Sequence, residues 1–258
     1  MKKVLVTGSK GQLGQTLQEY AFETKDIVFS FKGLDEVDIV DKNKVNLELG
    51  SNLYDYCINC AAYTDVEKAE QKPDRAFEIN SEGVKNLALA CKQSKTILVH
   101  ISTDYVFDGE KEGAYTIQDI PNPINEYGKS KLKGEEYIRT LLPNHYIVRT
   151  SWLYSKKYGH NFYRTVVNKA RAGEELRITD MQIGTPTETD NLSRFLLNEI
   201  LMGNKPFGTY HFSDGNAMSW YDFAKKILQE NKLADTAKLI LDRNYHTFAR
   251  RPKNSVLS

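Results

Sequence analysis

The chain has 258 residues, 40% of them hydrophobic, and a formal net charge of +1 at pH 7. A chain of this length can bury a large core or divide into a main domain and a smaller lobe. The near-neutral charge provides no basic surface for nucleic acid, and no apolar run reaches the ~18 residues that a membrane helix needs, so we predict a cytoplasmic protein.

A glycine loop near the amino terminus predicts a dinucleotide site. The apolar strand predicted at 3–7 runs into the sequence GSKGQLG at 8–14, and residues 15–22 continue with helical periodicity. Gly8 allows the tight turn, Gly11 lets the backbone approach a pyrophosphate, and Gly14 lets helix and strand pack closely. The spacing differs by one residue from the usual fingerprint, but its place after a strand favours a cofactor loop over a plain turn. We predict that the cofactor-binding residues of this loop are Gly8, Gly11, Gln12, Leu13 and Gly14.

The second predicted strand, 27–31, suggests which cofactor binds. It ends without the acidic residue that bonds the ribose hydroxyls in many NAD-binding units. Lys32 follows instead, and a lysine can pair with a 2′-phosphate, which favours NADPH. Lys32 could also be a solvated loop residue, and Asp35 or Glu36 could reach the ribose, so NADH stays open.

Two cysteines in the third predicted strand, 54–60, imitate a redox or zinc motif. Cys57 and Cys60 are an odd number of residues apart, so their side chains point to opposite faces of a strand. No second cysteine or histidine pair completes a metal site. We therefore predict buried packing. The strand is followed by Ala61, Ala62, Tyr63 and Thr64, which we assign to the cofactor.

The predicted strands at 3–7, 27–31, 54–60, 96–101 and 145–149 alternate with helical segments. This alternation indicates parallel β-α-β units, and hence an α/β fold with a Rossmann-like, doubly wound parallel sheet. Several strands close with small or hydroxylated residues, at the sheet edge where such folds bind ligands.

The most informative block follows the fourth of these strands. The sequence STDYVFDG at 102–109 would emerge at the carboxyl edge of the sheet, and Tyr127 and Lys131 follow on a helix that we predict to begin near Glu126, with Asn125 as its N-cap. Residues four apart share a helix face, so Lys131 can lie beside Tyr127 and favour its phenolate. The Tyr-x-x-x-Lys spacing alone also fits an ordinary half-buried helix face.

Together these blocks resemble the extended short-chain dehydrogenase/reductase superfamily, and within it the dTDP-4-dehydrorhamnose reductase family. Further motifs that carry the closer resemblance are Asn80 in a helical stretch, RTSW at 149–152, D-x-Q-x-G-x-P-T at 180–187 and R-P-x-N-S at 251–255. Nucleotide-sugar epimerases of the superfamily usually show a Ser-Ser-x-x-Val-Tyr-Gly type block where this sequence has TDYVF at 103–107, which favours a reductase over an epimerase.

The resemblance implies reduction of the 4-keto group of dTDP-4-dehydro-6-deoxy-L-mannose to dTDP-L-rhamnose by hydride transfer from NAD(P)H. Tyr127 would protonate the developing alkoxide, Lys131 would tune Tyr127 and bond the ribose, and Thr103 would hydrogen-bond the carbonyl oxygen. Asp104 could bond a sugar hydroxyl or form a structural turn. Asn80 could support the lysine through water or be merely solvated.

The same resemblance implies the remaining site residues. Asp38 and Ile39 match the family's adenine-contacting pair, and Trp152 would pack against the sugar or deoxythymidine, although it could equally be a core aromatic. The residues expected around the sugar diphosphate are Asn161, Gln182, Gly184 and Arg251. Arginine suits this position because its planar fork matches paired oxygens.

After Ser151 the elements become shorter and richer in turn residues and aromatics. We expect a cofactor domain from 1–151 and 188–203, and a sugar-nucleotide lobe from 152–187 and 204–258. Members of the family usually continue beyond the 251–255 motif, so a lobe that ends at Ser258 is either incomplete or naturally minimal. Gln15 and Thr16 stand where some members place an acidic residue for magnesium, so no metal is expected.

Other functions remain open on the sequence. A different 4-keto-6-deoxy nucleotide sugar would use the same chemistry, and a related protein acts as a non-catalytic regulatory subunit. An intact Thr103, Tyr127 and Lys131 argues for an enzyme. The expected partner is the small nucleotide-sugar substrate. A homodimer is compatible with the sequence, which does not fix the oligomeric state.

Overall fold

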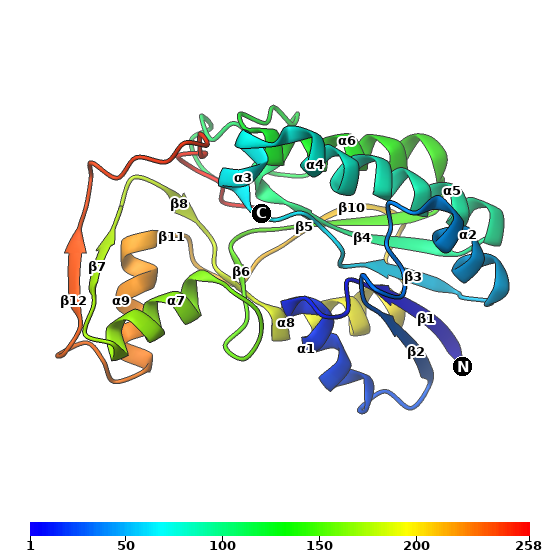
Figure 1. Ribbon diagram of the computed structural model, residues 1–258, viewed down its shortest axis with the longest axis horizontal. Helices are drawn as coiled ribbons and strands as arrows, with labels where there is room; N and C mark the ends of the chain where they lie inside the picture. Colours follow the sequence, from blue (N-terminus) through cyan, green and yellow to red (C-terminus); the bar gives the residue numbers. More distant parts are fainter.

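The computed structural model describes residues 1–258 and is built around a six-stranded parallel sheet (Figure 1). Its strands are β1 (Lys2–Thr7), β2 (Ile27–Lys32), β3 (Tyr56–Asn59), β4 (Ile97–Thr103), β5 (His145–Thr150) and β10 (Gly208–Phe212). They lie in the order β10-β5-β4-β3-β1-β2, and every neighbouring pair is parallel. Successive strands are added on one side of β1 as far as β2, and from β3 onwards they are added on the other side. This change of side is the doubly wound, Rossmann-like arrangement that the sequence predicted.

Helices cover both faces of this sheet. One face carries α2 (Lys42–Ser51), α5 (Val84–Ser94) and α6 (Glu126–Leu141), and the other carries α1 (Gln12–Ala21) and α8 (Thr189–Phe195), which continues as the π-helix η3 (Leu196–Leu201). Side chains of β1 alternate between the two cores: Val4 and Val6 pack with α1 and α8, whereas Leu5 packs with α2 and α5. Three shorter helical turns, α3 (Val66–Gln71), α4 (Pro73–Phe77) and the π-helix η1 (Glu78–Gly83), connect β3 to α5.

The cysteines of the C-x-x-C sequence pack as the strand alternation predicted. Cys57 is buried in the core under α2 and α5, and Cys60 packs against the core on the opposite face. All three cysteines of the chain are free thiols.

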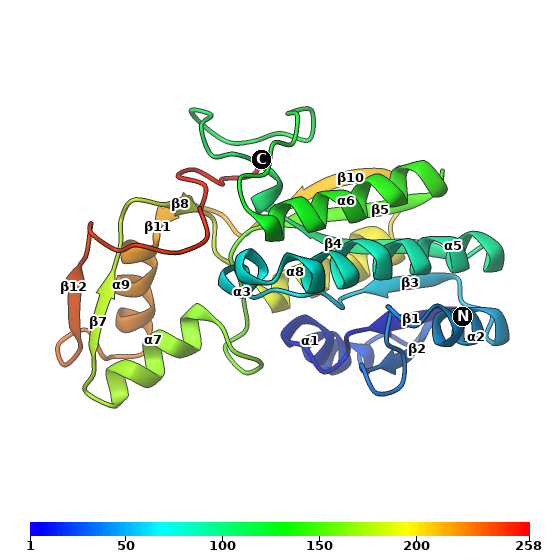
Figure 2. The ribbon, with the colours of Figure 1, turned by 45° about the horizontal axis from the view of Figure 1, so that its top comes forward.

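A smaller lobe lies beyond the carboxyl ends of the strands (Figure 2). It contains α7 (Phe162–Arg171) and α9 (Trp220–Glu230), the parallel pair β7 (Glu175–Ile178) and β12 (Lys238–Leu241), and the antiparallel pair β8 (Ile183–Gly184) and β11 (Met218–Ser219). Its own hydrophobic core is centred on Val166, Leu176 and Phe223. A short parallel pair, β6 (Leu153–Tyr154) with β9 (Thr187–Glu188), lies at the junction with the main domain.

The predicted boundary of the lobe is wrong at one element. Residues 208–212, assigned to the lobe, form β10, which pairs with β5 as the edge strand of the main sheet. Every residue of β10 is half-buried, as suits an edge strand. Its polar residues Thr209 and His211 interrupt the apolar pattern that marks the other strands of the sheet.

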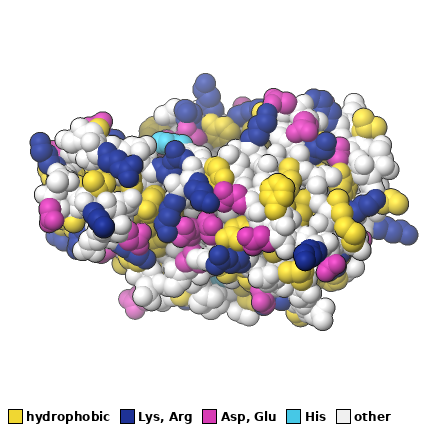
Figure 3. Space-filling model, turned by 90° about the horizontal axis from the view of Figure 1, so that it is seen from below, with side chains coloured by type: hydrophobic (Ala, Val, Ile, Leu, Met, Phe, Trp, Pro, Cys, Tyr) yellow, Lys and Arg dark blue, Asp and Glu magenta, His cyan; other side chains and the backbone are white.

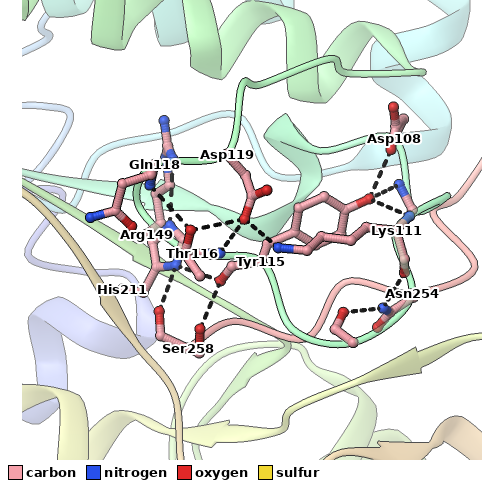
Figure 4. Close-up of polar contacts among 12 residues, drawn as sticks. Asp108, Lys111, Tyr115, Thr116, Gln118, Asp119, Arg149, His211, Asn254 and Ser258 are labelled. Carbon is pink, nitrogen blue, oxygen red and sulfur yellow. Dashed lines mark hydrogen bonds and ion pairs between the residues drawn. The ribbon is translucent and has the colours of Figure 1, made fainter.

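The end of the chain also returns to the main domain. Leu257 forms an isolated bridge with Tyr115, in the loop that follows β4, and the backbone N–H of Ser258 donates to the Tyr115 carbonyl over 2.9 Å. Figure 4 shows this loop, the tail and β10 meeting: His211 Nδ1 lies 3.0 Å from the Tyr115 carbonyl and 3.1 Å from that of Ser258. The tail thus fixes the loop after β4.

Acidic and basic side chains are interspersed on the surface seen in Figure 3, and neither sign of charge dominates it. No helix of the structure has both the length and the apolar character needed to cross a membrane.

Candidate active site

A cavity of about 570 Å³ lies where the carboxyl ends of the central strands face the lobe. The strand order reverses between β1 and β3 at this edge, which is where doubly wound sheets bind ligands. The cavity brings together most of the predicted site residues: Gly11, Gln12, Leu13, Gly14, Ala62, Thr64, Thr103, Asp104, Tyr127, Lys131, Trp152, Asn161 and Arg251.

Gly8 lies just behind the cavity and shapes the glycine loop. Its φ is +64°, and a Cβ at this position would lie 2.5 Å from the Ala61 nitrogen, so only glycine fits. Gly11 is the N-cap of α1 and no side chain caps this helix end. The first backbone N–H groups of α1 therefore face the cavity without a protein side chain to accept from them, as a pyrophosphate site requires.

Tyr63 and Ala61 also lie outside the cavity lining. Asn80, buried in η1, accepts from the Tyr63 backbone N–H over 2.8 Å and donates to the Tyr63 carbonyl over 2.9 Å. The predicted alternative of a solvated Asn80 is therefore wrong, and its role in the structure is to hold the loop after β3.

The residues predicted for the adenosine end form a separate group beyond β2. Lys32 Nζ lies 3.4 Å from a Glu36 carboxylate oxygen, and both side chains are partly exposed. The carboxylate of Asp38 accepts from the Val40 backbone N–H over 3.0 Å, while Ile39 is buried. Asp38 thus stabilises its own turn, and Lys32 has an acidic neighbour with which a cofactor phosphate would compete.

Gln12 joins the glycine loop to the lobe. Its amide nitrogen donates to the Leu153 carbonyl over 3.1 Å, and its amide oxygen accepts from Asn161 over 3.1 Å. Asn161 is also the N-cap of α7, where it accepts from the Arg164 backbone N–H over 3.0 Å. The side chains of Gln12 and Asn161 are thus engaged with each other at the cavity wall.

Tyr127 lies in the first turn of α6 and faces Thr103 at the end of β4. Asn125 is the N-cap of this helix, as predicted, and accepts from the Gly128 backbone N–H over 2.8 Å. Burial raises the pKa of Tyr127, and a hydrogen bond with the Thr103 hydroxyl opposes this shift in part. A phenol with a raised pKa keeps its proton near neutral pH, so Tyr127 is equipped as a proton donor.

Lys131 lies one helical turn further along α6 and is buried. Its ammonium nitrogen is 2.7 Å from the Ile101 carbonyl oxygen and 3.2 Å from His100 Nε2, both on β4. Burial lowers the pKa of Lys131 to about 8, and the charge of Glu135 opposes the shift. The sequence predicted Lys131 beside Tyr127 on the shared face, but not its contacts with β4.

Asp104 is buried and fully engaged with protein groups. One carboxylate oxygen accepts from the Thr103 hydroxyl over 3.0 Å and the other from the Ser151 hydroxyl over 2.8 Å. Burial raises the pKa of Asp104 to about 6, and hydrogen bonds from Ser255, Ser151 and Thr103 oppose the shift. Of its two predicted roles, these contacts support the structural one. They also direct the Thr103 hydroxyl proton towards Asp104.

Trp152 forms the aromatic wall on the lobe side. Its ring stacks on Trp220 with centroids 3.4 Å apart and planes 5° from parallel. Gln182 does not line the cavity; its amide oxygen accepts from the Trp220 indole N–H over 3.1 Å. A Cβ at Gly184 would lie 2.4 Å from the Trp152 ring, so this glycine makes room for the indole. Trp152 is thus both packed and exposed to the cavity.

Arg251 supplies the positive charge of the site. Its Nη2 lies 2.7 Å from a Glu67 carboxylate oxygen, and its Nη1 lies 3.3 Å from the Tyr105 hydroxyl. The buried Nε has no hydrogen-bond partner. A buried N–H of a guanidinium without an acceptor is costly, and an anionic ligand would satisfy it.

Several cavity residues escaped the sequence analysis, among them Tyr105, His160, Phe162 and Trp220. Of these residues, only Trp220 could have been suspected from the sequence. The chain contains only two tryptophans, and both line the cavity. Tyr105 was within the quoted STDYVFDG block, and only the fold shows that its ring meets Tyr127, with centroids 6.0 Å apart.

The sequence and the fold of this chain are similar to those of known proteins. The model of the family described as RmlD substrate binding domain matches residues 1–258. A dTDP-4-dehydrorhamnose reductase from Aggregatibacter actinomycetemcomitans is 37% identical over 100% of this chain and 90% of its own. A crystal structure named dTDP-4-dehydrorhamnose reductase from Clostridium acetobutylicum superposes with a TM-score of 0.92; it is 39% identical, and the match covers 99% of this chain and 90% of that one. A second structure of that name, from Bacillus anthracis in complex with NADP, superposes with a TM-score of 0.93; it is 36% identical, and the match covers 100% of this chain and 91% of that one.

Proposed function

The chain belongs to the RmlD substrate binding domain family, and from this premise we propose that it is a dTDP-4-dehydrorhamnose reductase dependent on NADPH. It would reduce the 4-keto group of dTDP-4-dehydro-6-deoxy-L-mannose to give dTDP-L-rhamnose. The observation that carries the proposal is geometric: the Tyr127 phenol and the Thr103 hydroxyl line the same cavity as the uncapped N-terminus of the glycine-loop helix.

The residues present fit a nicotinamide dinucleotide. The uncapped N-terminus of α1 would hold the pyrophosphate, Lys131 would bond the ribose, and Lys32 would pair with the 2′-phosphate. The Bacillus anthracis relative, which contains NADP, supports NADPH over NADH. When bound, the cofactor supplies the hydride that reduces the carbonyl carbon.

The protein's own groups handle the oxygen of the carbonyl. Tyr127 donates its proton as negative charge develops on that oxygen, and the Thr103 hydroxyl can add a second hydrogen bond once it turns from Asp104. Trp152 provides an aromatic surface for the sugar or the base, and Arg251 binds the diphosphate through the N–H that lacks an acceptor. Gln12 and Asn161 hold the lobe against the cofactor loop.

The test uses purified full-length protein, NADPH or NADH, and a panel of 4-keto-6-deoxy nucleotide sugars that differ in base and hydroxyl stereochemistry. We expect loss of nicotinamide absorbance and formation of dTDP-L-rhamnose, identified by NMR. Preference for another sugar in the panel would change the substrate and keep the chemistry. Absence of turnover with every sugar would favour the non-catalytic nucleotide-binding subunit. A parallel assay with chelator tests the expectation that no metal is used.

The cellular setting is part of the same proposal. Three free cysteines suit the reducing cytoplasm, where nucleotide sugars would be the available substrates. The sequence allows a homodimer without fixing the oligomeric state, and light scattering of the purified protein determines it.

A further inference from the structure

One segment on the lobe side reaches back onto the main domain. Residues 155–161, here called the strap, lead from β6 at the junction to α7 in the lobe, and they approach α1 in the views of Figures 1 and 2. The carboxylate of Glu19, on α1, accepts from Lys157 Nζ over 2.8 Å and from the Tyr158 hydroxyl over 2.5 Å. The strap thus ties the lobe to the helix that begins at the glycine loop.

A second contact joins the strap to the start of α1. Gly159 has a φ of +67°, and a Cβ there would lie 3.1 Å from Gln12 Cβ, so the strap backbone packs directly on the first residue of α1. Asn161, at the end of the strap, donates to the Gln12 amide oxygen over 3.1 Å. Gln12 and Glu19 are about two helical turns apart and share a face of α1, so the strap lies along this face.

Hydrogen bonds within the strap fix its shape. The buried Ser155 hydroxyl oxygen accepts from the backbone N–H groups of Lys157, over 3.2 Å, and Tyr158, over 3.1 Å. The Asn161 amide nitrogen donates back to the carbonyls of Ser155, over 2.9 Å, and Tyr158, over 3.2 Å. The strap is therefore closed on itself, which favours its movement as one unit.

The end of the strap borders the predicted pyrophosphate site. Gly159, His160 and Asn161 line the same cavity as Gly11, the N-cap of α1. No side chain caps this helix end, so its first backbone N–H groups are available to an anion. An anion bound there would lie between the glycine loop and the strap.

Of the charged and ionisable side chains of the strap, only His160 is left without a protein partner. Lys156 pairs with Glu188 over 3.0 Å, and Lys157 pairs with Glu19. His160 is exposed, lines the cavity and takes part in no hydrogen bond or ion pair. An imidazole always carries at least one N–H, which phosphate oxygens can accept. His160 therefore offers the cavity a donor beside the start of α1.

We propose that the strap closes over the pyrophosphate of the dinucleotide, with His160 as a further donor to that pyrophosphate and Glu19 as the positioning residue that holds the strap in place. The inference rests on the proposed function, which places a dinucleotide at the N-terminus of α1. Release of the cofactor then requires the strap to lift from Glu19. The lobe that receives the sugar thus also controls how long the cofactor stays bound.

The first test measures release of NADPH with no sugar present. The fluorescence of bound NADPH is followed after the full-length protein is mixed with excess NADP⁺, which occupies each site as it empties. Glu19→Ala should release NADPH roughly 3- to 10-fold faster, a modest factor because the contacts of Glu19 are partly exposed. Glu23→Ala is the matched control: Glu23 is exposed, lies two residues beyond α1 and takes part in no ion pair. Equal release from wild type and Glu19→Ala would refute the role of Glu19.

A double variant checks that Glu19 acts through the strap. Tyr158→Phe removes one of the hydroxyls that Glu19 accepts from, so its effect on release should largely disappear when Glu19 is already alanine. Hydrogen exchange of the protein without cofactor gives a second reading. The amides of Lys157 and Tyr158 should exchange faster in Glu19→Ala, while those of the buried strand β4 keep wild-type rates. Additive effects of the two changes on release would contradict the proposed contact.

The second test identifies the diphosphate that His160 contacts. His160→Ala should weaken binding of NADPH roughly 3- to 10-fold and leave binding of dTDP unchanged, both followed by calorimetry. His160→Gln keeps an N–H donor and should recover part of the loss. His246→Ala is the control, because His246 is exposed and does not line the cavity. Weaker binding of dTDP with unchanged binding of NADPH would assign His160 to the sugar nucleotide and overturn the proposal.

The outcomes separate this inference from the proposed function. A wild-type protein that binds NADPH, with faster release from Glu19→Ala, but reduces no sugar of the panel refutes the reductase and leaves the strap in place. A protein that reduces the sugar while Glu19→Ala and His160→Ala hold NADPH as wild type does refutes the strap alone. A wild-type protein that binds no NADPH refutes both.

Discussion

Gly128 lies so close to Tyr105 that a Cβ on the glycine would be 2.1 Å from the Tyr105 carbonyl oxygen. The contact joins the first turn of α6, which carries Tyr127, to the segment that follows Thr103. The two groups that face the reacting oxygen are therefore held at their separation by backbone packing.

Gly128→Ala should destabilise the protein by roughly 1–3 kcal/mol, because neither backbone can move without disturbing α6 or β4. It should also lower turnover, since Tyr127 is the adjacent residue. Gly50→Ala is the matched control: no atom lies within 4 Å of a Cβ there, and the residue is in α2, so this change should stabilise by about 0.5–1 kcal/mol. Urea unfolding of both variants measures the difference, and equal stabilities would contradict it.

Tyr127→Phe should lose about 10²- to 10⁴-fold in kcat while cofactor affinity stays near that of wild type, because only the proton donor is removed. Tyr137→Phe controls for the loss of a hydroxyl from the same helix, because the Tyr137 hydroxyl donates to Glu82 over 2.9 Å and Tyr137 does not line the cavity. Single-turnover reduction and cofactor titration make the comparison. Turnover of Tyr127→Phe at the wild-type rate would remove Tyr127 from the proposed mechanism.

Thr103→Ala and Tyr127→Phe should be non-additive in rate, because the two hydroxyls line the same cavity and would serve one oxygen. The double variant should therefore lose less than the product of the single losses. Hydride transfer in a single turnover is the measurement for all three variants. Strictly multiplicative losses would mean that the two side chains act on different atoms.

Lys32→Ala should weaken NADPH more than NADH, since only NADPH carries the phosphate with which the lysine would pair. The Glu36 carboxylate lies 3.4 Å from Lys32 and competes with the phosphate for the lysine. Glu36→Gln should therefore raise the affinity for NADPH. Lys25→Ala, on the loop before β2, is the control for loss of one positive charge. Equal changes of KM for both cofactors in Lys32→Ala would refute the phosphate contact.

The carboxyl of Asp104 makes stability depend on pH. Burial raises its pKa from 3.8 to about 6, so the native state holds a proton that the unfolded chain releases. The resulting stabilisation is complete below pH ~4 and is lost as the pH rises through about 6, a change of roughly 3 kcal/mol. The stability of Asp104→Asn should not fall in this way. The difference in free energy of unfolding between Asp104→Asn and wild type should therefore move in favour of the variant by roughly 3 kcal/mol between pH 4 and 7. Chemical unfolding across this range measures it, with exposed Asp235→Asn as the control; parallel curves for wild type and Asp104→Asn would contradict it.

Much of the fold was open to prediction because its parallel strands are buried on both faces and stand out as apolar runs, as in β1 and β4. β10 was missed because an edge strand tolerates polar residues such as His211. In the site, Tyr127 and Thr103 could be predicted from local motifs. The contact between His100 and Lys131 could not, because it joins β4 to α6 across 31 residues and depends on how both pack.

The chain passes between the main domain and the lobe after β5, before α8, after β10 and again before the tail. A body attached through one linker can swing about it, whereas several tethers side by side resist both swing and twist. Four such connections therefore favour a short slide of packed elements over a hinge rotation of the lobe. Selection of a sugar therefore depends on the shape of a cleft that largely exists before the sugar arrives.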